Sequence, residues 1–179
     1  MELTDIFHKR RSTRDFSTTP VPRETLLQLV DVVRHSPSGT NKCPWHFVIV
    51  TERDTLHRLS QTHPHCRWLN SAKAGIAIVA DPAITRYWLE DCCIVAYSIW
   101  LAATAQGLGV AWAAMYQSDN TLESARRQSF VREVLSVPNG FHVPVVLGIG
   151  YPKDQVPEKT RPSLEEIVHW EHYTLDSLH

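Results

Sequence analysis

The sequence lacks several features that would assign it to a specialised class. Its 179 residues carry 18 Lys and Arg against 19 Asp and Glu, which excludes the broadly basic surface of a nucleic-acid binder. The longest apolar stretch, residues 92–105, contains Ser98 and Thr104 and is shorter than the roughly 18 apolar residues of a membrane-spanning helix. Acidic Glu2 and Asp5 stand where a signal peptide has basic residues, so we expect a cytoplasmic protein.

Cysteine is scarce as well. The four cysteines, Cys43, Cys66, Cys92 and Cys93, show no Cys-x-x-Cys spacing, which excludes a disulfide-dense framework. We therefore expect free thiols. Neither Cys92 nor Cys93 has a base or cation beside it in a helix that is predicted to be buried, so neither is a good candidate for a nucleophile.

The hydrophobic pattern predicts helices alternating with strands. Leu26, Leu29 and Val33 recur at helical spacing, whereas short apolar runs bounded by turn residues are typical of strands. After a short opening helix, the predicted elements are helices over 22–35, 87–106 and 122–135, a polar helix near Leu56 and Leu59, a capped helix beginning at Ser163, and strands over 46–50, 75–80, 110–114 and 143–149. This alternation indicates the α/β or α+β class.

The domain organisation is simple. No internal repeat or low-complexity linker occurs, so we expect a single domain over residues 1–179. The helix predicted over 87–106 is apolar on nearly every side, which places it inside the molecule or between two molecules.

A cluster of cations and hydroxyls follows the opening helix. Arg10, Arg11, Ser12 and Arg14 lie within five residues, and guanidinium groups with a nearby hydroxyl match the oxygens of a phosphate. The alternative is a solvated basic face without a ligand. Lys159 and Arg161 form a second pair of cations near the C-terminus, and cations from distant parts of a chain commonly hold one phosphate.

The segment from residue 37 to residue 45 predicts a rigid polar loop that leads into a strand. Pro37 and Ser38 begin it, Gly39 permits close approach of the backbone to a flat ligand, and Asn41 can donate and accept hydrogen bonds. Trp45 can anchor the loop in the core. The alternative is a plain turn with a buried tryptophan.

Together these segments resemble the nitroreductase family of flavoenzymes, in its smaller, single-domain branch. The matching stretches, in chain order, are RRSTRDF at 10–16, PSGTNKCPW at 37–45, GLGVAW at 107–112, VPVVLGIGYP at 143–152 and the segment 159–168. The resemblance implies a three-layer α+β fold, in which helices flank a central mixed sheet and two chains interlock as a homodimer. It also implies one FMN at each end of the subunit interface.

The resemblance also implies which residues bind FMN. The N-terminal motif and the C-terminal cations would hold the phosphate and the polar edge of the flavin, the loop would reach the flavin from the other subunit, and a strand end would pass the ring system. The residues so implied are Arg10, Arg11, Ser12, Arg14, Pro37, Ser38, Gly39, Asn41, Trp112, Ala113, Ala114, Lys159 and Arg161.

The sequence departs from the family pattern at two places. Cys43 stands where the family usually has glutamine, and Ala113-Ala114 replaces a stretch that often contains glycine. Neither change removes a phosphate ligand, but both leave open which group donates to flavin N5.

The function implied by the resemblance is electron transfer through FMN. NADH or NADPH would reduce the flavin, and a small acceptor such as a nitroaromatic or a quinone would then take two electrons, in a ping-pong sequence. No catalytic side chain is required, because the cofactor carries the chemistry. One alternative is a flavin carrier or redox sensor with little turnover. Another is a related flavoenzyme that dehalogenates its substrate or fragments flavin.

The stretch His63-Pro64-His65-Cys66 offers three metal-capable side chains. Pro64 restricts the backbone and no complementary ligand cluster stands out, so we expect no metal site. With Arg67 and Trp68, these histidines could instead line the mouth of a substrate pocket.

Overall fold

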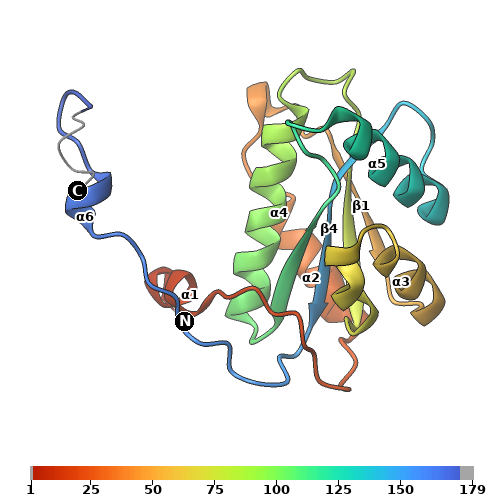
Figure 1. Ribbon diagram of the computed structural model, residues 1–179, viewed down its shortest axis with the longest axis horizontal. Helices are drawn as coiled ribbons and strands as arrows, with labels where there is room; N and C mark the ends of the chain where they lie inside the picture. The colour runs from red at the N-terminus through yellow and green to blue at the C-terminus, as the bar shows by residue number, and fades with distance from the viewer. Residues whose placement is uncertain (1, 174–179) are drawn as a thin grey trace.

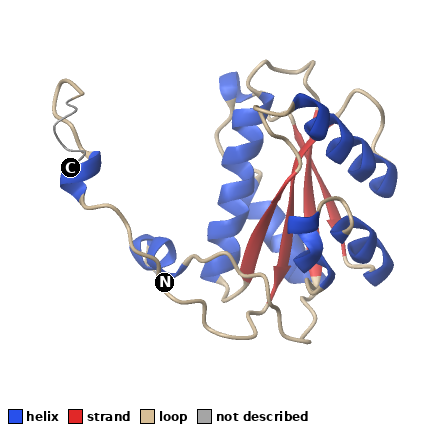
Figure 2. Cartoon of the chain, in the orientation of Figure 1, coloured by secondary structure: helices blue, strands red, loops and turns tan. Residues whose placement is uncertain are grey.

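A four-stranded sheet lies between helices on both of its faces (Figures 1 and 2). The computed structural model describes residues 2–173. The strands are β1 (Trp45–Val50), β2 (Ala74–Ala80), β3 (Gly109–Ala114) and β4 (His142–Gly150). All four strands agree with the sequence prediction to within one residue at each end.

The helices also follow the prediction closely. Each long predicted helix is present, and the capping box at Ser163 is formed. The α-helices are α1 (Leu3–Lys9), α2 (Arg23–Val33), α3 (Arg53–Ser60), α4 (Trp88–Ala105), α5 (Thr121–Leu135) and α6 (Leu164–Ile167), and the 3₁₀ helices are η1 (Gly39–Asn41) and η2 (Pro64–Asn70). Helix α2 ends at Val33, two residues before its predicted end and close to the Ser36-Pro37 stop.

The strand order is β1-β2-β4-β3, and every neighbouring pair is antiparallel. The α+β class is confirmed, but the expected mixed sheet is corrected to an antiparallel one. The strands β2 and β3, joined by α4, run in the same direction, and β4 is inserted between them, so no two parallel strands are neighbours. Within residues 2–173, parallel pairing occurs only at an isolated bridge between Ser12 and Val110.

Two hydrophobic cores occupy the two faces of the sheet. One packs α2 and α4 against Ile76, Ile78 and Leu147, and the other packs α3, η2 and α5 against Ala77 and Val146. Because side chains alternate along a strand, β2 and β4 contribute to both cores. Three layers result, with the helices α2 and α4 on one side of the sheet and α3, η2 and α5 on the other.

Helix α4 has a buried face and an exposed apolar face. Val95 and Ile99 are fully buried against the sheet, whereas Ile94 is 42% exposed and Tyr97 is 36% exposed. The ring of Phe7 from α1 lies edge-on to Tyr97, with ring centroids 6.2 Å apart. No helix among residues 2–173 combines the length and apolar character that crossing a membrane requires.

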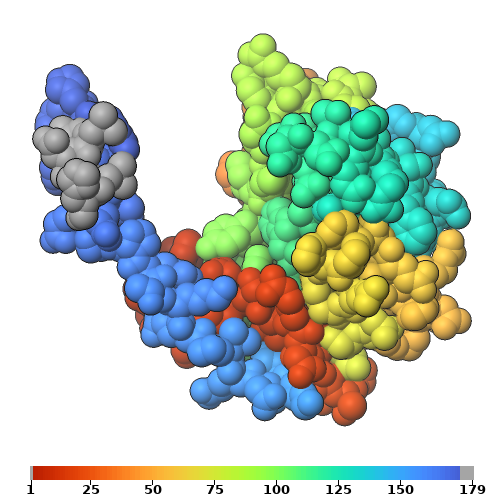
Figure 3. Space-filling model, in the orientation of Figure 1, coloured from red at the N-terminus to blue at the C-terminus, as the bar shows by residue number. Residues whose placement is uncertain are grey.

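The C-terminal segment leaves the body as an arm. It follows β4 past Pro152, which forms a bridge with Phe16, and the arm with α6 projects away from the sheet and its helices (Figures 1 and 3). Apolar side chains on this arm are exposed, among them Leu164, Ile167 and Trp170, the last at 81%. Exposed apolar groups in such numbers are typical of a surface that binds another chain.

Paired glycines allow η2 to pack closely on the sheet. Gly148 lies directly opposite Gly75 in the β2–β4 register. A Cβ atom on Gly148 would lie 2.5 Å from Cζ3 of Trp68, whereas the nearest atom to a Cβ on Gly75 would be Cδ2 of Leu56, at 3.2 Å.

We expect Gly148→Ala to lower the free energy of unfolding by about 1–3 kcal/mol, because the indole of Trp68 would have to move. Gly75→Ala, at the residue that pairs with Gly148 on the neighbouring strand, is the matched control and should lower the free energy of unfolding by less. Urea denaturation of the two variants and the parent protein measures both values. An equal effect of the two substitutions would contradict the close packing of η2.

Candidate functional site

The N-terminal cation segment lies along the start of β3 and the later part of α4. The guanidinium carbon of Arg10 lies 4.8 Å from the ring centroid of Trp100, and the indole N–H of Trp100 donates to the carbonyl of Arg11 at 3.3 Å. Ser12 pairs with Val110 on β3. Arg10 and Ser12 are therefore placed where α4 and β3 meet.

Arg11 differs from the other predicted cations because both of its terminal guanidinium nitrogens have partners within the chain. Its Nη1 donates to the carbonyls of His8 and Arg10, and its Nη2 lies 3.3 Å from Oε1 of Glu158 on the C-terminal arm. The side chain is only 15% exposed. These contacts give Arg11 a structural role that joins α1 to the arm.

The remaining predicted cations have no acidic partner. None of the ion pairs among residues 2–173 includes Arg10, Arg14, Lys159 or Arg161. Because Glu158 is held beside Arg11, the arm cations that follow it begin close to the N-terminal segment. The ion pair between Arg11 and Glu158 thus links the arm to the N-terminal segment, whereas Lys159 and Arg161 lie further along the arm, which projects away from the sheet.

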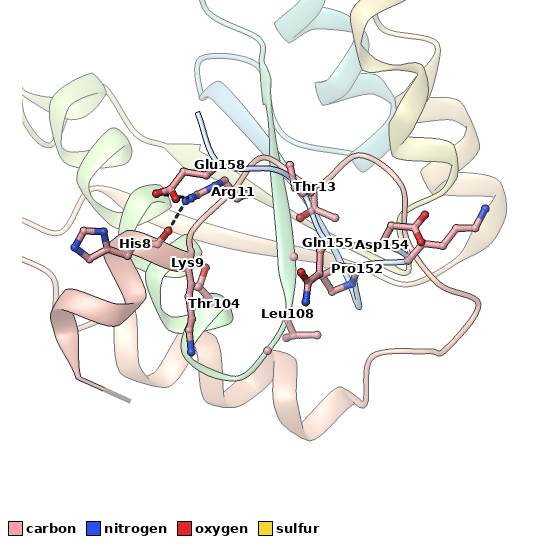
Figure 4. A pocket seen from close by; sticks show the side chains of 14 residues that line it. His8, Lys9, Arg11, Thr13, Thr104, Leu108, Pro152, Asp154, Gln155 and Glu158 are labelled. Atoms are coloured by element: carbon pink, nitrogen blue, oxygen red, sulfur yellow. Dashed lines mark hydrogen bonds and ion pairs between the residues drawn. The ribbon is translucent and has the colours of Figure 1, made fainter. Parts of the chain in front are cut away.

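A cavity of about 640 Å³ lies between α1, the turn after α4 and the first part of the arm (Figure 4). Of the predicted site residues, only Arg11 lines it. Lys9 and Lys153 share its wall with Asp154 and Glu158, and carboxylates compete with an anionic ligand for the same cations. Because its lining carries charges of both signs, the cavity is less suited to a phosphate than the cations that have no acidic partner.

The outer edge of β3 faces away from β4, and other segments of the chain occupy part of it. The carbonyl of Val110 accepts from the amide of Thr13 at 3.0 Å, and that of Ala114 accepts from Nη1 of Arg127 at 3.1 Å. Alternate residues of a strand point their backbone groups to the same side, so those of Trp112 also face away from β4. Ala113 directs its backbone groups to β4 and is buried, so it offers no exposed group to a ligand.

The predicted loop lies against the first turn of α4. The amide of Gly39 donates to Oδ1 of Asp91 at 2.8 Å, and the Ser38 hydroxyl accepts from the amide of Cys43 at 2.9 Å. Trp45 is buried, which confirms the predicted anchor. Pro37 and Asn41, the other predicted loop residues, are exposed.

Within one chain the loop and the N-terminal cations lie toward different ends of α4. Asp91, which holds the loop, precedes Trp100, which contacts Arg10, by nine residues. That separation corresponds to about 14 Å along the helix axis. The structure therefore does not bring all predicted site residues together within one chain.

Sequence reasoning missed two residues that support these segments. Asp91 holds the loop, and its signal was the position of an acid in an otherwise apolar helix. Arg127, which is 6% exposed, holds the end of β3, and its signal was the Glu123–Arg127 spacing of four residues on a predicted helix.

The four cysteines are unpaired, and the Cys92 thiol is protonated near neutral pH. All four are free, which confirms the expectation of unpaired thiols. Burial, with smaller contributions from Cys93 and Asp91, raises the pKa of Cys92 to about 12, so its thiolate is not populated near neutral pH.

His63 and Arg67 line a separate cavity of about 370 Å³, bordered by α3 and η2. Nδ1 of His63 accepts from the amide of His65 at 3.2 Å and so caps η2. Burial, followed by the charge of Arg127, lowers the pKa of His63. In the described part of the chain, no three His, Cys, Asp or Glu side chains gather as metal ligands.

The architecture defines a class of α+β proteins that is known from solved structures. A Bacteroides thetaiotaomicron protein named as an NADH dehydrogenase/NAD(P)H nitroreductase superimposes with a TM-score of 0.87 at 29% identity, over 96% of this chain and 98% of that one. An FMN-dependent nitroreductase of Clostridium difficile R20291 does so with a TM-score of 0.84 at 27% identity, over 94% and 98%.

Sequence comparison leads to the same group. The nitroreductase family model matches residues 8–74 and 52–151. An Archaeoglobus fulgidus protein, also named as an NADH dehydrogenase/NAD(P)H nitroreductase, is 30% identical over 158 residues, which are 86% of this chain and 87% of that protein. The chain belongs to the nitroreductase family, as its motifs predicted.

The carboxylate that holds Arg127 at the end of β3 makes stability depend on pH. Hydrogen bonds from Arg126 and Arg127 lower the pKa of Glu123 to about 2, from an ordinary value of 4.5 in the unfolded chain. The unfolded chain binds the proton more readily. The stabilisation is therefore complete above about pH 4.5 and is lost as the pH falls toward 2.

We expect the stability difference between the parent protein and Glu123→Gln to be largest near neutral pH and to shrink below about pH 4.5. Urea denaturation at several pH values measures it. Glu133→Gln is the matched control, because it removes a carboxylate of the same helix that lies 3.8 Å from an exposed Arg58 nitrogen. A difference for Glu123→Gln that does not change with pH would contradict this role.

Proposed function

We propose that this protein is an FMN-dependent oxidoreductase that transfers two electrons from NADH or NADPH to a small acceptor, such as a nitroaromatic or a quinone, in a ping-pong sequence. We propose further that residues 1–179 form one cofactor-binding domain and that the protein works as a homodimer. The observation that carries the proposal is that Arg10 and Arg14, which form no ion pair among residues 2–173, flank the residues that pair with the outer edge of β3 in a chain of this family.

The unpaired cations fit a phosphate monoester. Arg10, Arg14 and Arg161 retain their charges without a carboxylate partner, and guanidinium groups bind phosphate oxygens with two parallel hydrogen bonds. Ser12 adds a hydroxyl donor and Lys159 a further charge. Arg11 contributes indirectly, because it fixes the segment and the arm on which these groups are carried.

The edge of β3 fits the polar rim of a flat ring system. The amide and carbonyl of Trp112 and the amide of Ala114 face outward in one row, as donors and an acceptor for a planar heterocycle, whereas the Ala114 carbonyl accepts from Arg127. FMN, when bound, supplies the chemistry of hydride acceptance and of electron delivery to the acceptor. The protein positions the two reactants at one ring face, and the cations and amides around it favour an anionic cofactor.

A second copy of the chain completes the site in this proposal. The Ser38–Asn41 loop and the Arg10 segment lie toward different ends of α4, so the loop of one subunit would serve the cations of the other. The exposed apolar face of α4 and the apolar arm supply the contact surface, with Ile94 on the helix and Trp170 on the arm.

The first test is anaerobic absorbance spectroscopy of the purified protein with added FMN. We expect a flavin band near about 450 nm that bleaches on addition of NADH or NADPH and returns with an acceptor. Bound flavin that does not bleach would favour the flavin carrier or sensor. Failure to bind FMN would contradict the proposal.

The phosphate site is tested by the double variant Arg10→Ala, Arg161→Ala. We expect FMN binding to weaken by at least about a hundredfold while the fold is retained, because each change removes a charge-assisted contact. Titration of flavin fluorescence gives the Kd. The control Arg34→Ala, Arg58→Ala removes two exposed arginines whose partners are Asp31 and Glu133, and should leave the Kd unchanged.

The subunit contact is tested on α4. We expect Ile94→Glu to convert a dimer to monomers and to weaken FMN binding, because a charge would be placed in an apolar contact. Size-exclusion chromatography with light scattering measures the mass. Leu122→Glu, at an 84% exposed position of α5, is the control and should leave the dimer intact. A monomeric parent protein that binds FMN would refute the shared site.

A further inference from the structure

The Ser38–Cys43 loop is held in an unusual backbone conformation. Thr40, Asn41 and Cys43 all have positive φ angles, of 54°, 57° and 45°. Such angles are tolerated by asparagine but are unfavourable for a β-branched threonine. Strained backbone of this kind persists only where the surrounding structure restrains it, and it is concentrated at binding sites.

Asp91 supplies the restraint from outside the loop. Its Oδ1 accepts the Gly39 amide at 2.8 Å, and its side chain belongs to α4, 52 residues further along the chain. The loop backbone also lies directly on Tyr87, because a Cβ on Gly39 would be 2.7 Å from Cδ2 of that ring. One hydrogen bond and one close contact therefore fix Gly39 to the first turn of α4.

The burial of Asp91 is not explained by stability alone. The residue is 2% exposed, and its second oxygen, Oδ2, is buried without a hydrogen-bond partner among residues 2–173. A buried carboxylate with an unsatisfied oxygen is unfavourable for folding, and an apolar side chain at the same position of an apolar helix would avoid that cost. A buried polar group of this kind needs another reason to be present.

We propose that Asp91 is the positioning residue of the Ser38–Cys43 loop. Its Oδ1 holds the Gly39 amide so that the loop keeps the left-handed conformation in which Ser38 and Asn41 face the cofactor of the partner subunit. The loop is then ordered before the cofactor arrives, and binding does not have to be preceded by an unfavourable rearrangement. The cofactor part of this assignment rests on the proposed function, whereas the restraint on the loop does not.

The assignment requires an acceptor oxygen at position 91. Asp91→Asn retains that oxygen and can orient it toward Gly39, whereas Asp91→Ala removes it. We expect Asp91→Ala to weaken FMN binding by about tenfold or more, and Asp91→Asn to remain within about threefold of the parent protein. Fluorescence titration of the full-length protein gives these Kd values.

A second readout follows the loop itself in the FMN-free protein. Hydrogen exchange, detected by mass spectrometry, reports the amides of the peptide that spans residues 38–43. We expect exchange there to accelerate by about tenfold or more in Asp91→Ala and to remain near the parent rate in Asp91→Asn. A residue that only stabilised the fold would not change this peptide selectively, nor would asparagine restore it.

Cys92→Ala is the matched control, because Cys92 is the next residue of the same helix and is fully buried. It should lower stability without changing either the FMN affinity or the exchange of the loop. If Asp91→Ala does not fold, Asp91→Asn still tests the assignment. Loss of FMN binding or faster loop exchange in Asp91→Asn would overturn it.

The two proposals fail in different ways. Unchanged FMN affinity and unchanged loop exchange in Asp91→Ala would overturn the role of Asp91. A parent protein that binds no FMN would remove the cofactor role, whatever the exchange experiment shows. Accelerated loop exchange in Asp91→Ala together with tenfold weaker FMN binding supports both parts.

Discussion

The position of β4 between β2 and β3 is the constraint on which the rest of the structure depends. Residues 143–150 of this strand are all buried, and its backbone is paired on both sides. Alternate side chains of β4 therefore pack in both cores. Leu147 packs with α4 in one core, and Val146 packs with α5 in the other. Because β4 occupies the place next to β2, β3 becomes an edge strand, and its outer backbone groups become available to the N-terminal segment and to a ligand.

The charged residues divide into two groups according to whether the chain itself neutralises them. Arg11 and Arg127 are mostly buried and hold segments in place through carbonyls and carboxylates. Among residues 2–173, Arg10, Arg14 and Arg161 have no carboxylate partner, and in the proposed function they bind the phosphate of the cofactor. Neighbouring arginines of one motif, such as Arg10 and Arg11, therefore differ in whether the chain itself neutralises them.

Much of the fold could be predicted from local patterns. Apolar runs and helical spacing located the strands and the long helices to within a few residues. A strand that is buried on both faces needs consecutive apolar residues, and a helix that is buried on one face needs apolar residues at helical spacing. The order of the strands in the sheet has no such local pattern. Packing between segments that are distant in sequence places β4 between β2 and β3. The expected mixed sheet was therefore wrong.

The candidate site was predicted less evenly. Arg10 and Ser12 lie beside β3 in a position suited to the role that the motif implies, whereas Ala113 offers no exposed group because its neighbours, not its own identity, decide which way its backbone points. Asp91 and Arg127 were not predicted because each contacts a different element of the fold, and neither an acid in a helix nor an ordinary helical ion-pair spacing indicates which residue will be contacted.

The sequence by itself determined the family, the secondary structure and the supply of cations, because these depend on residue type and local spacing. Tertiary structure alone decided that Arg11 is paired with the arm, which edge of the sheet is open and how the strained loop is held. Those properties depend on contacts between residues far apart in sequence, such as Gly39 with Asp91 and Arg11 with Glu158. Such contacts form only when the chain folds, so a local sequence pattern does not predict them.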